Sequence, residues 1–152
     1  IYLTAGTAGS AAGLAIGLAL CGVESQLRLV SAVERWAFNA MMLRLKLREV
    51  YAELLARGLD GPARVHDLLA RARVQWSILG DAVGPGYGRP TAAAREATHL
   101  ADAAGLRLET TYTGKCLAAM RSDLEDATGQ DLLFWNTHAG QDLGPLVAEA
   151  AR

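Results

Sequence analysis

The chain is poor in several residue types that would mark a specialised class of protein. Its 152 residues include two cysteines, four prolines and 6% aromatic residues, and its formal net charge is −1. Without an excess of basic residues, we expect no nucleic-acid partner. The apolar segment from Ala11 to Cys21 is shorter than the roughly 20 residues that a membrane helix needs. We therefore expect no membrane partner either.

The rare cysteine and histidine residues predict neither a disulfide nor a metal site. Cys21 and Cys116 lack a CxxC partner, so we expect buried thiols in a reducing compartment, the cytoplasm. His66, His99 and His138 share no metal-ligand spacing with each other or with the cysteines. We accordingly expect no metal.

What the chain does have is apolar residues, at 51% of the sequence. This content and the length suit one domain with a core. The sequence begins at Ile1 inside a strand-like run and without a starting Met. We interpret residues 1–152 as a single α/β domain that forms the C-terminal part of a longer chain. The tryptophans are expected to fill core or interface: Trp36, Trp76 and Trp135.

Strand-like and helix-like segments alternate along the sequence. Apolar runs predict strands at 1–4, 27–33, 74–79 and 131–136, and the short stretch 106–108 is a further candidate. Helices are predicted at 10–20, from the N-cap Asn39 to Arg57, after Gly61-Pro62, and at 91–104, 113–126 and from Asp142. In the second helix the predicted buried stripe is Met42, Leu45, Val50 and Leu54.

This alternation predicts a three-layer αβα domain, Rossmann-like, with a mainly parallel twisted sheet. In such sheets, ligands bind beyond the carboxyl ends of the strands. Four irregular segments fall at those ends, and we expect them to converge on one crevice. They are Ala5–Ser10, Gly84–Arg89, Thr110–Lys115 and Asn136–Gly140.

The first of these segments predicts a phosphate site. A strand breaks into the loop Gly6, Thr7, Ala8, Gly9 and Ser10, which then becomes a helix. Free backbone N–H groups and the helix dipole both favour an anion at that point. The glycines allow close approach of the backbone, and the Thr and Ser hydroxyls add donors.

The other segments carry side chains suited to a ligand. Tyr87 stands in a Gly-Pro-Gly-Tyr-Gly frame, which offers no core packing for its ring. Tyr112 precedes a helix start, and Asn136 and Thr137 end an apolar strand. Polar residues at that strand end are well placed to hydrogen-bond a ligand ring.

Together these motifs resemble one enzyme family. Residues 6–14 resemble its GSGGTxAGL loop, 84–90 match GPGYGxP, 112–115 match YTGK, and 133–137 are similar to the LFLHTGG strand end. In this order and spacing, the chain resembles the D-cysteine desulfhydrase and 1-aminocyclopropane-1-carboxylate deaminase family. These are pyridoxal 5'-phosphate enzymes of the tryptophan-synthase-β-like group, fold type II. The resemblance runs from Ile1 to about Gly144.

The resemblance implies a role for each motif. The loop 6–10 would hold the phosphate of pyridoxal phosphate, and Thr137 would lie beside its pyridine nitrogen. Tyr87 and Tyr112 would be the catalytic residues that flank a small amino-acid substrate, with Asn136 and Thr113 as substrate contacts. A homodimer is also implied.

Position 113 favours one branch of the family. The deaminase-like branch tends to have Glu after the tyrosine, whereas Thr113 is similar to the desulfhydrase-like branch. The resemblance therefore implies α,β-elimination on a small D-amino acid, which gives a keto acid, ammonia and a leaving group such as sulfide.

Two departures from the family pattern stand out. The HTGG strand end reads Asn136-Thr137-His138-Ala139 here, which points to a divergent substrate. The sequence has only Lys46 and Lys115, and neither matches the Schiff-base lysine of the family. We expect that lysine upstream of Ile1 and expect residues 1–152 alone to be inactive.

Two other functions remain open from the residues alone. The strand–glycine loop–helix order also fits a nicotinamide-dinucleotide Rossmann domain, with Glu34 as a ribose contact. Against it, the glycines at 6, 9 and 13 do not form GxGxxG, and residues 84–88 and 112–115 stay unexplained. A non-catalytic α/β fragment that binds a partner through an exposed sheet edge is the third possibility.

Overall fold

A computed structural model describes residues 1–124, 127 and 129–138 of the chain. The helix predicted from Asp142 and the end of the segment 136–140 lie outside these residues. In chain order the elements are β1 (Tyr2–Ala5), α1 (Gly9–Leu20), β2 (Ser25–Ser31), α2 (Ala40–Ala56), α3 (Val65–Arg71), β3 (Val74–Leu79), the 3-10 helix η1 (Asp81–Val83), α4 (Ala92–Ala103), α5 (Thr113–Ser122) and β4 (Phe134–Trp135).

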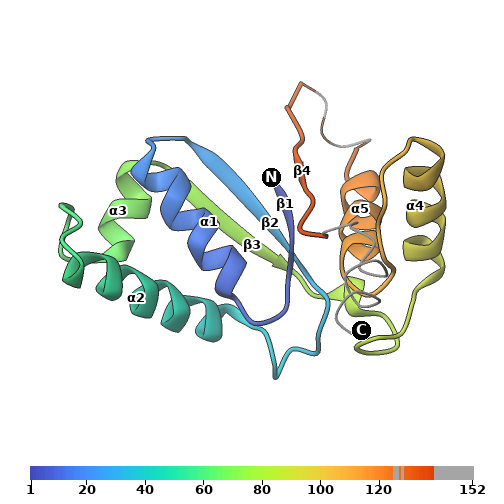
Figure 1. Cartoon of the computed structure of the whole chain (residues 1–152), viewed down its shortest axis with the longest axis horizontal. Coiled ribbons are helices and arrows are strands. Elements are labelled where there is room, and N and C mark those ends of the chain that lie inside the picture. The colour runs from blue at the N-terminus through green and yellow to red at the C-terminus, as the bar shows by residue number, and fades with distance from the viewer. Residues whose placement is uncertain (125–126, 128, 139–152) are drawn as a thin grey trace, which may run out of the picture.

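The four described strands form one parallel sheet in the order β3-β2-β1-β4. Leu3 of β1 pairs with Leu29 on one side and with Trp135 on the other. Helices α1, α2 and α3 cover one face, while α4 and α5 lie on the other side (Figure 1). The three-layer αβα fold with a parallel sheet is therefore confirmed.

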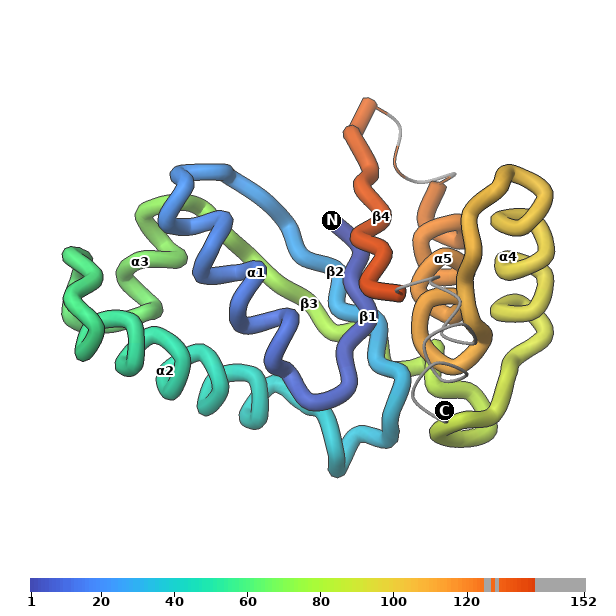
Figure 2. The backbone as a smooth tube through the Cα atoms, viewed as in Figure 1, coloured from blue at the N-terminus to red at the C-terminus, as the bar shows by residue number. Residues whose placement is uncertain are grey.

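The order of the strands brings the predicted ligand segments to one end of the sheet. Figure 2 shows the chain leaving β1 and turning back at once into α1. β1 and β4 are neighbours, so the loop after β1 and the residues after β4 leave the sheet side by side.

The main apolar core lies between the sheet and α1 to α3. Leu3, Leu27 and Leu29 point to this side and are fully buried. Strand residues alternate between faces, so their neighbours Tyr2 and Val30 belong to a separate small cluster on the α5 side. The α1 helix meets the core with small side chains, which lets it lie close to the sheet.

The predicted helix boundaries agree well with the structure where capping residues mark them. Asn39 caps α2, because its side chain accepts hydrogen bonds from the N–H groups of Met41 and Met42 at 3.0 and 3.1 Å. Thr91 caps α4 in the same way through Ala94 N. Gly58 follows α2 with a φ of +93°, which suits a glycine stop.

The predicted buried stripe of α2 was wrong. The structure buries Leu43, Leu47 and Tyr51, while Met42 and Leu45 are exposed. The reason is that α2 carries apolar residues on more than one face, so periodicity alone does not fix which face meets the core. Val50 and Leu54, also predicted for the stripe, are only partly buried.

Several predicted elements differ in extent, and the strand predicted at 27–33 is found at Ser25–Ser31. Residues 106–108 form no strand, because Leu106 N bonds back to Ala101 O and completes the end of α4. The predicted strand 131–136 is reduced to Phe134–Trp135. Helix α5 ends at Ser122, with Asp123 as its C-cap, so the predicted end at residue 126 was too late.

The prediction that both cysteines are buried was wrong for Cys21, and only one of the three tryptophans packs in a core, so an interface position for the other two stays a prediction. Cys21 is exposed because it follows the last turn of α1, whereas Cys116 is buried in α5 as expected. Trp36 is 81% exposed, since it lies in the turn between β2 and α2 and not in a core. Trp135 is exposed too, whereas Trp76 packs against the main core.

Candidate active site

The loop between β1 and α1 has a backbone suited to an anion. Ala8 has φ +65° and ψ −9°, a left-handed conformation, and the helix begins at the next residue. A left-handed residue followed by helical ones turns successive N–H groups toward one side, which forms an anion-binding nest. Among the described residues, no acceptor pairs with the N–H groups of Thr7, Gly9 or Ser10. These three residues are exposed.

Tyr87 and Tyr112, predicted from separate motifs, meet in the structure. The Tyr112 hydroxyl donates to the Tyr87 hydroxyl at 2.9 Å. Their rings meet edge to face, with centroids 5.9 Å apart and an angle of 70°. This arrangement is a common one for aromatic pairs, and it joins the 84–90 loop to the start of α5.

The tyrosine pair forms part of a cavity of about 310 Å³. We call it the tyrosine cavity. It includes three of the predicted site residues besides Tyr87, together with residues that were not predicted. The lining consists of Tyr87, Glu109, Thr111, Tyr112, Thr113, Thr137 and His138.

The tyrosine cavity adjoins the loop after β1. A Cβ atom added to Gly6 would lie 3.4 Å from Tyr112 Cε1 and 3.8 Å from its hydroxyl oxygen. Thus the Tyr112 ring lies against the backbone of Gly6, where a larger residue would crowd it. Residues from three of the four segments predicted to converge line the cavity, and the remaining segment, 5–10, meets them through the contact of Gly6 with Tyr112.

The Tyr112 phenol is a hydrogen-bond donor at neutral pH. Its hydrogen bond to Tyr87, its partial burial and the nearby charge of Glu109 raise the pKa of Tyr112 to about 12. A phenol with that pKa is protonated at pH 7 and is a poor general base without a cationic neighbour. In the structure its single hydroxyl proton is donated to Tyr87, so the Tyr87 hydroxyl is the one of the pair whose proton can be donated into the cavity.

Sequence reasoning missed Glu109, which organises the start of α5. Its carboxylate accepts from the N–H groups of Thr111, Tyr112 and Thr113 at 2.7, 2.9 and 2.7 Å. Burial alone would raise the pKa of Glu109, but these N–H donors outweigh it and lower the pKa. An acidic residue just before a helix start was the available signal.

Thr113 and Asn136, the two predicted substrate contacts, both form hydrogen bonds with residues close to them in the sequence. The Thr113 hydroxyl accepts from Glu109 N at 3.1 Å and contacts a Glu109 carboxylate oxygen at 3.2 Å. The Asn136 side-chain oxygen accepts from His138 N at 2.9 Å. Thr113 is part of the cavity wall, whereas Asn136 is not among its lining residues.

Neither lysine of the sequence lines the tyrosine cavity. Lys46 lies on α2, where its amine pairs with Glu49 at 2.7 Å. Lys115 is 1% exposed and donates to the carbonyl of Val83 at 2.8 Å. Neither lysine is therefore placed to form a covalent bond with a molecule in the tyrosine cavity.

Glu34, the ribose contact of the dinucleotide alternative, has another partner. Its carboxylate accepts the Tyr87 N–H at 3.1 Å, and this bond is the main reason why the pKa of Glu34 is lowered. A ribose hydroxyl would have to share or displace that contact.

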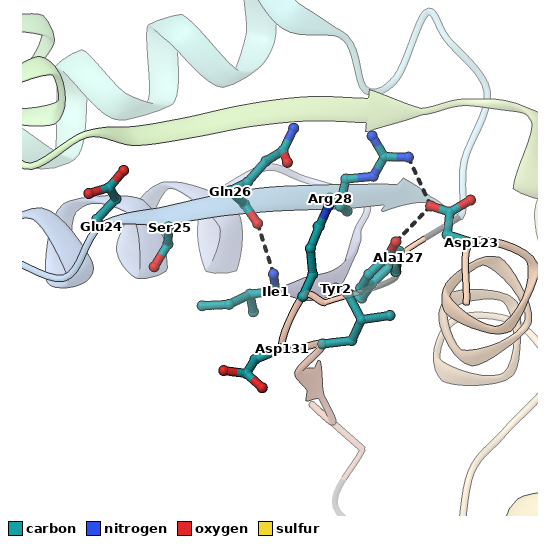
Figure 3. Close-up of a pocket in the computed structure, with 11 residues that line it drawn as sticks. Ile1, Tyr2, Glu24, Ser25, Gln26, Arg28, Asp123, Ala127 and Asp131 are labelled. Carbon is teal, nitrogen blue, oxygen red and sulfur yellow. Dashed lines mark hydrogen bonds and ion pairs between the residues drawn. The ribbon is translucent and has the colours of Figure 1, made fainter. Parts of the chain in front are cut away.

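A second polar site lies on the α5 side of the sheet, near the amino ends of β1 and β2 (Figure 3). There the Asp123 carboxylate accepts from the Tyr2 hydroxyl at 2.6 Å and from Arg28 at 2.8 Å. The hydrogen bond from Tyr2 and the pairing with Arg28 lower the pKa of Asp123. The adjoining pocket measures about 430 Å³. Sequence reasoning did not anticipate this group, because its members are 95 or more residues apart, except for the Tyr2–Arg28 strand pair.

Comparison with known proteins gives one informative similarity. No family model matches the chain. The chain is 34% identical to nocardicin C-9' epimerase of Nocardia uniformis subsp. tsuyamanensis, over 98% of its own length. It spans 43% of the length of that protein. Among the described residues, no helix combines the length and apolarity that a bilayer crossing requires.

Proposed function

We propose that this chain forms the cofactor-phosphate and substrate-flanking part of a pyridoxal-phosphate enzyme that acts on a small amino acid. The observation that carries the proposal is that Tyr87, Tyr112 and Thr137 line one cavity and that Tyr112 lies against Gly6, the first residue of the loop 6–10. A phosphate at Gly9 would direct the attached ring toward a space bordered by phenols and a neutral hydroxyl.

Each residue then has a specific task. The N–H groups of Thr7, Gly9 and Ser10 bind the phosphate, and the Thr137 hydroxyl contacts the ring nitrogen. When bound, pyridoxal phosphate withdraws electrons and so makes the carbon next to the substrate amine acidic. The Tyr87 phenol donates a hydrogen bond or a proton to the substrate, and the Tyr112 phenol, which donates to Tyr87, can replace a proton that Tyr87 gives up.

The reaction class that we favour is proton transfer that inverts a stereocentre. The chain is 34% identical to an epimerase. Epimerisation removes a proton from one side of a carbon, which the lysine expected upstream of Ile1 would accept, and returns one on the other side, which the tyrosine pair would supply. The hydrogen bond from Tyr112 to Tyr87 supports this role, because it offers a path by which a proton can be replaced.

A second candidate is α,β-elimination on a D-amino acid such as D-cysteine. It begins with the same proton removal and then expels a leaving group. The residue after Tyr112 supports it, since Thr113 is similar to the desulfhydrase-like branch. Here the Thr113 hydroxyl is bonded to Glu109, so it would act by shaping the cavity wall.

Cofactor binding is tested with a matched pair of glycine variants in the full-length protein. Gly9 and Gly13 both lie on α1, are exposed, and have open space around a built Cβ. Gly9→Asp places a carboxylate in the phosphate position and should abolish binding, whereas Gly13→Asp, one turn further, should retain it. Binding is read from the absorption of bound pyridoxal phosphate at about 400–430 nm. Equal binding by both variants would refute the proposal.

The reaction class is tested on the same protein in deuterated water. Epimerisation predicts exchange of the proton next to the amine and loss of optical purity without keto-acid release. Elimination predicts pyruvate and sulfide from D-cysteine. Tyr112→Phe should slow either reaction by about 10²–10⁴-fold. The control is Tyr51→Phe. Tyr51 lies on α2, where its hydroxyl donates to the Pro62 carbonyl, so its loss should leave the rate nearly unchanged. The family resemblance also leads us to propose a homodimer, which sedimentation tests.

A further inference from the structure

The loop 84–90, which carries Tyr87, has a backbone that cannot hold itself in place. Gly84, Gly86 and Gly88 have φ values of +62°, +138° and +71°. Glycine reaches these conformations without strain, but it also has the largest freedom to leave them. The loop's internal hydrogen bonds are turn contacts of 3.2 to 3.4 Å. What fixes the Tyr87 ring must therefore come from other elements.

The first outside contact comes from beneath the loop. Lys115 lies in the first turn of α5 and is 1% exposed. Its amine donates to the carbonyl of Val83 at 2.8 Å and lies 3.5 Å from that of Gly86. A buried ammonium is costly unless hydrogen bonds replace its water. The carbonyls of Val83, just before the loop, and of Gly86, within it, replace that water here, so the loop and Lys115 depend on each other.

The second contact comes from the segment that follows β2. Glu34 accepts the Tyr87 N–H at 3.1 Å, and a Cβ on Gly86 would lie 3.4 Å from the same carboxylate oxygen. The loop is thus held between an ammonium that binds its carbonyls and a carboxylate that binds its N–H. The Gly86 carbonyl and the Tyr87 N–H belong to the same peptide unit, so the two charges bind opposite sides of it, and Lys115 also binds the peptide unit that follows Val83.

We propose that Lys115 and Glu34 are positioning residues that hold the Tyr87 loop, so that the Tyr87 phenol stays hydrogen-bonded to Tyr112 at the tyrosine cavity. The lysine of the YTGK motif thereby acts through the loop and not through covalent chemistry. The importance of these two contacts for turnover rests on the proposed function, but the contacts themselves form without a cofactor.

The test measures loop order in the protein without cofactor. Hydrogen exchange of the Tyr87 amide reports its bond to Glu34, and chymotrypsin cleavage after Tyr87 reports loop opening. We expect Lys115→Met to increase both rates by about tenfold or more. Glu34→Ala, which removes only the partly exposed partner, should have the same effect. Lys115→Arg keeps the charge and donors and should restore much of the protection.

Matched controls come from the exposed pair on α2. Lys46→Met and Glu49→Ala remove the same groups from an ion pair far from the loop, and should leave both rates unchanged. If Lys115→Met does not fold, Glu34→Ala and Lys115→Arg decide the question. Unchanged protection in Glu34→Ala together with native protection in any folded Lys115→Met would overturn the proposal. Loss of pyridoxal-phosphate binding with an ordered loop would instead refute the proposed function alone.

Discussion

The two faces of the sheet differ in the polarity of the side chains that cover them. The face under α1 to α3 is lined by Leu3, Leu27 and Leu29 and packed by alanines and leucines. The face under α5 has a small apolar cluster of Tyr2, Val30 and Cys116. Beside it lie buried polar side chains, which are Thr4, Thr113 and Lys115. One face therefore stabilises the fold, and the other positions the candidate site.

The difference shows what a polar face requires. Buried polar groups cost free energy unless each finds a hydrogen-bond partner. In the described part of the chain, every buried side-chain nitrogen or oxygen has one. Thr4 donates to Tyr112 O at 3.2 Å, so even the strand contributes to holding the tyrosine. The site is stable because its wall is internally satisfied.

The largest expected effect tests the apolar face. Leu29→Ala removes a fully buried side chain from the centre of β2 and leaves a cavity. We expect the free energy of unfolding to fall by about 2–5 kcal/mol, measured by urea denaturation. Trp36→Ala, at an 81% exposed position, is the control and should change it by less than about 0.5 kcal/mol. Similar losses in both variants would mean that Trp36 is covered in the protein.

The apolar face was also the part that sequence predicted best. Strand 74–79 and the helix that follows Asn39 agree with the structure because local signals, an apolar run and a capping side chain, mark them. Which face of α2 is buried could not be predicted, since apolar residues occur around that helix. The predicted end of α5 was also wrong: the helix stops before Asp123, whose side chain binds Tyr2 and Arg28 of the sheet, and the local sequence does not show that contact.

On the polar face, sequence predicted motifs but not how they are connected. Tyr87, Tyr112 and Thr137 were singled out and do share a cavity, because strand ends of a parallel sheet meet at one edge. Their roles stay predictions. The role of Glu109 at the start of α5 and the burial of Lys115 were not predicted. Both depend on hydrogen-bond partners that folding brings together, and a short sequence motif does not show these partners.

A smaller effect is expected from the polar face at Glu109. Glu109→Gln weakens the hydrogen bonds to three N–H groups, so the free energy of unfolding should fall by about 1–3 kcal/mol at neutral pH. The pKa of Glu109 is lowered below its ordinary 4.5, so its stabilisation is present above pH 4.5 and is lost as pH falls through the folded pKa. Urea denaturation at a series of pH values should show the two proteins converging in acid.

The matched control for that series is Glu53→Gln. Glu53 pairs with Arg57 at 2.7 Å on the exposed surface of α2 and should contribute about 0.3–0.5 kcal/mol. A difference between wild type and Glu109→Gln that persists unchanged in acid would mean that the carboxylate charge is not what stabilises α5.

The smallest perturbation, a thiol label, distinguishes the faces without altering the fold. Cys21 follows α1 and is exposed, whereas Cys116 is fully buried in α5. Burial raises the pKa of Cys116 from 9.0 to about 11. At neutral pH its thiolate fraction is therefore about 100-fold lower than that of a thiol with the ordinary pKa. A thiol reagent, mapped by mass spectrometry, should modify Cys21 rapidly and Cys116 only on unfolding. Rapid labelling of both in the native protein would show that α5 opens locally, and would break the assignment of that face as a rigid support for Tyr112.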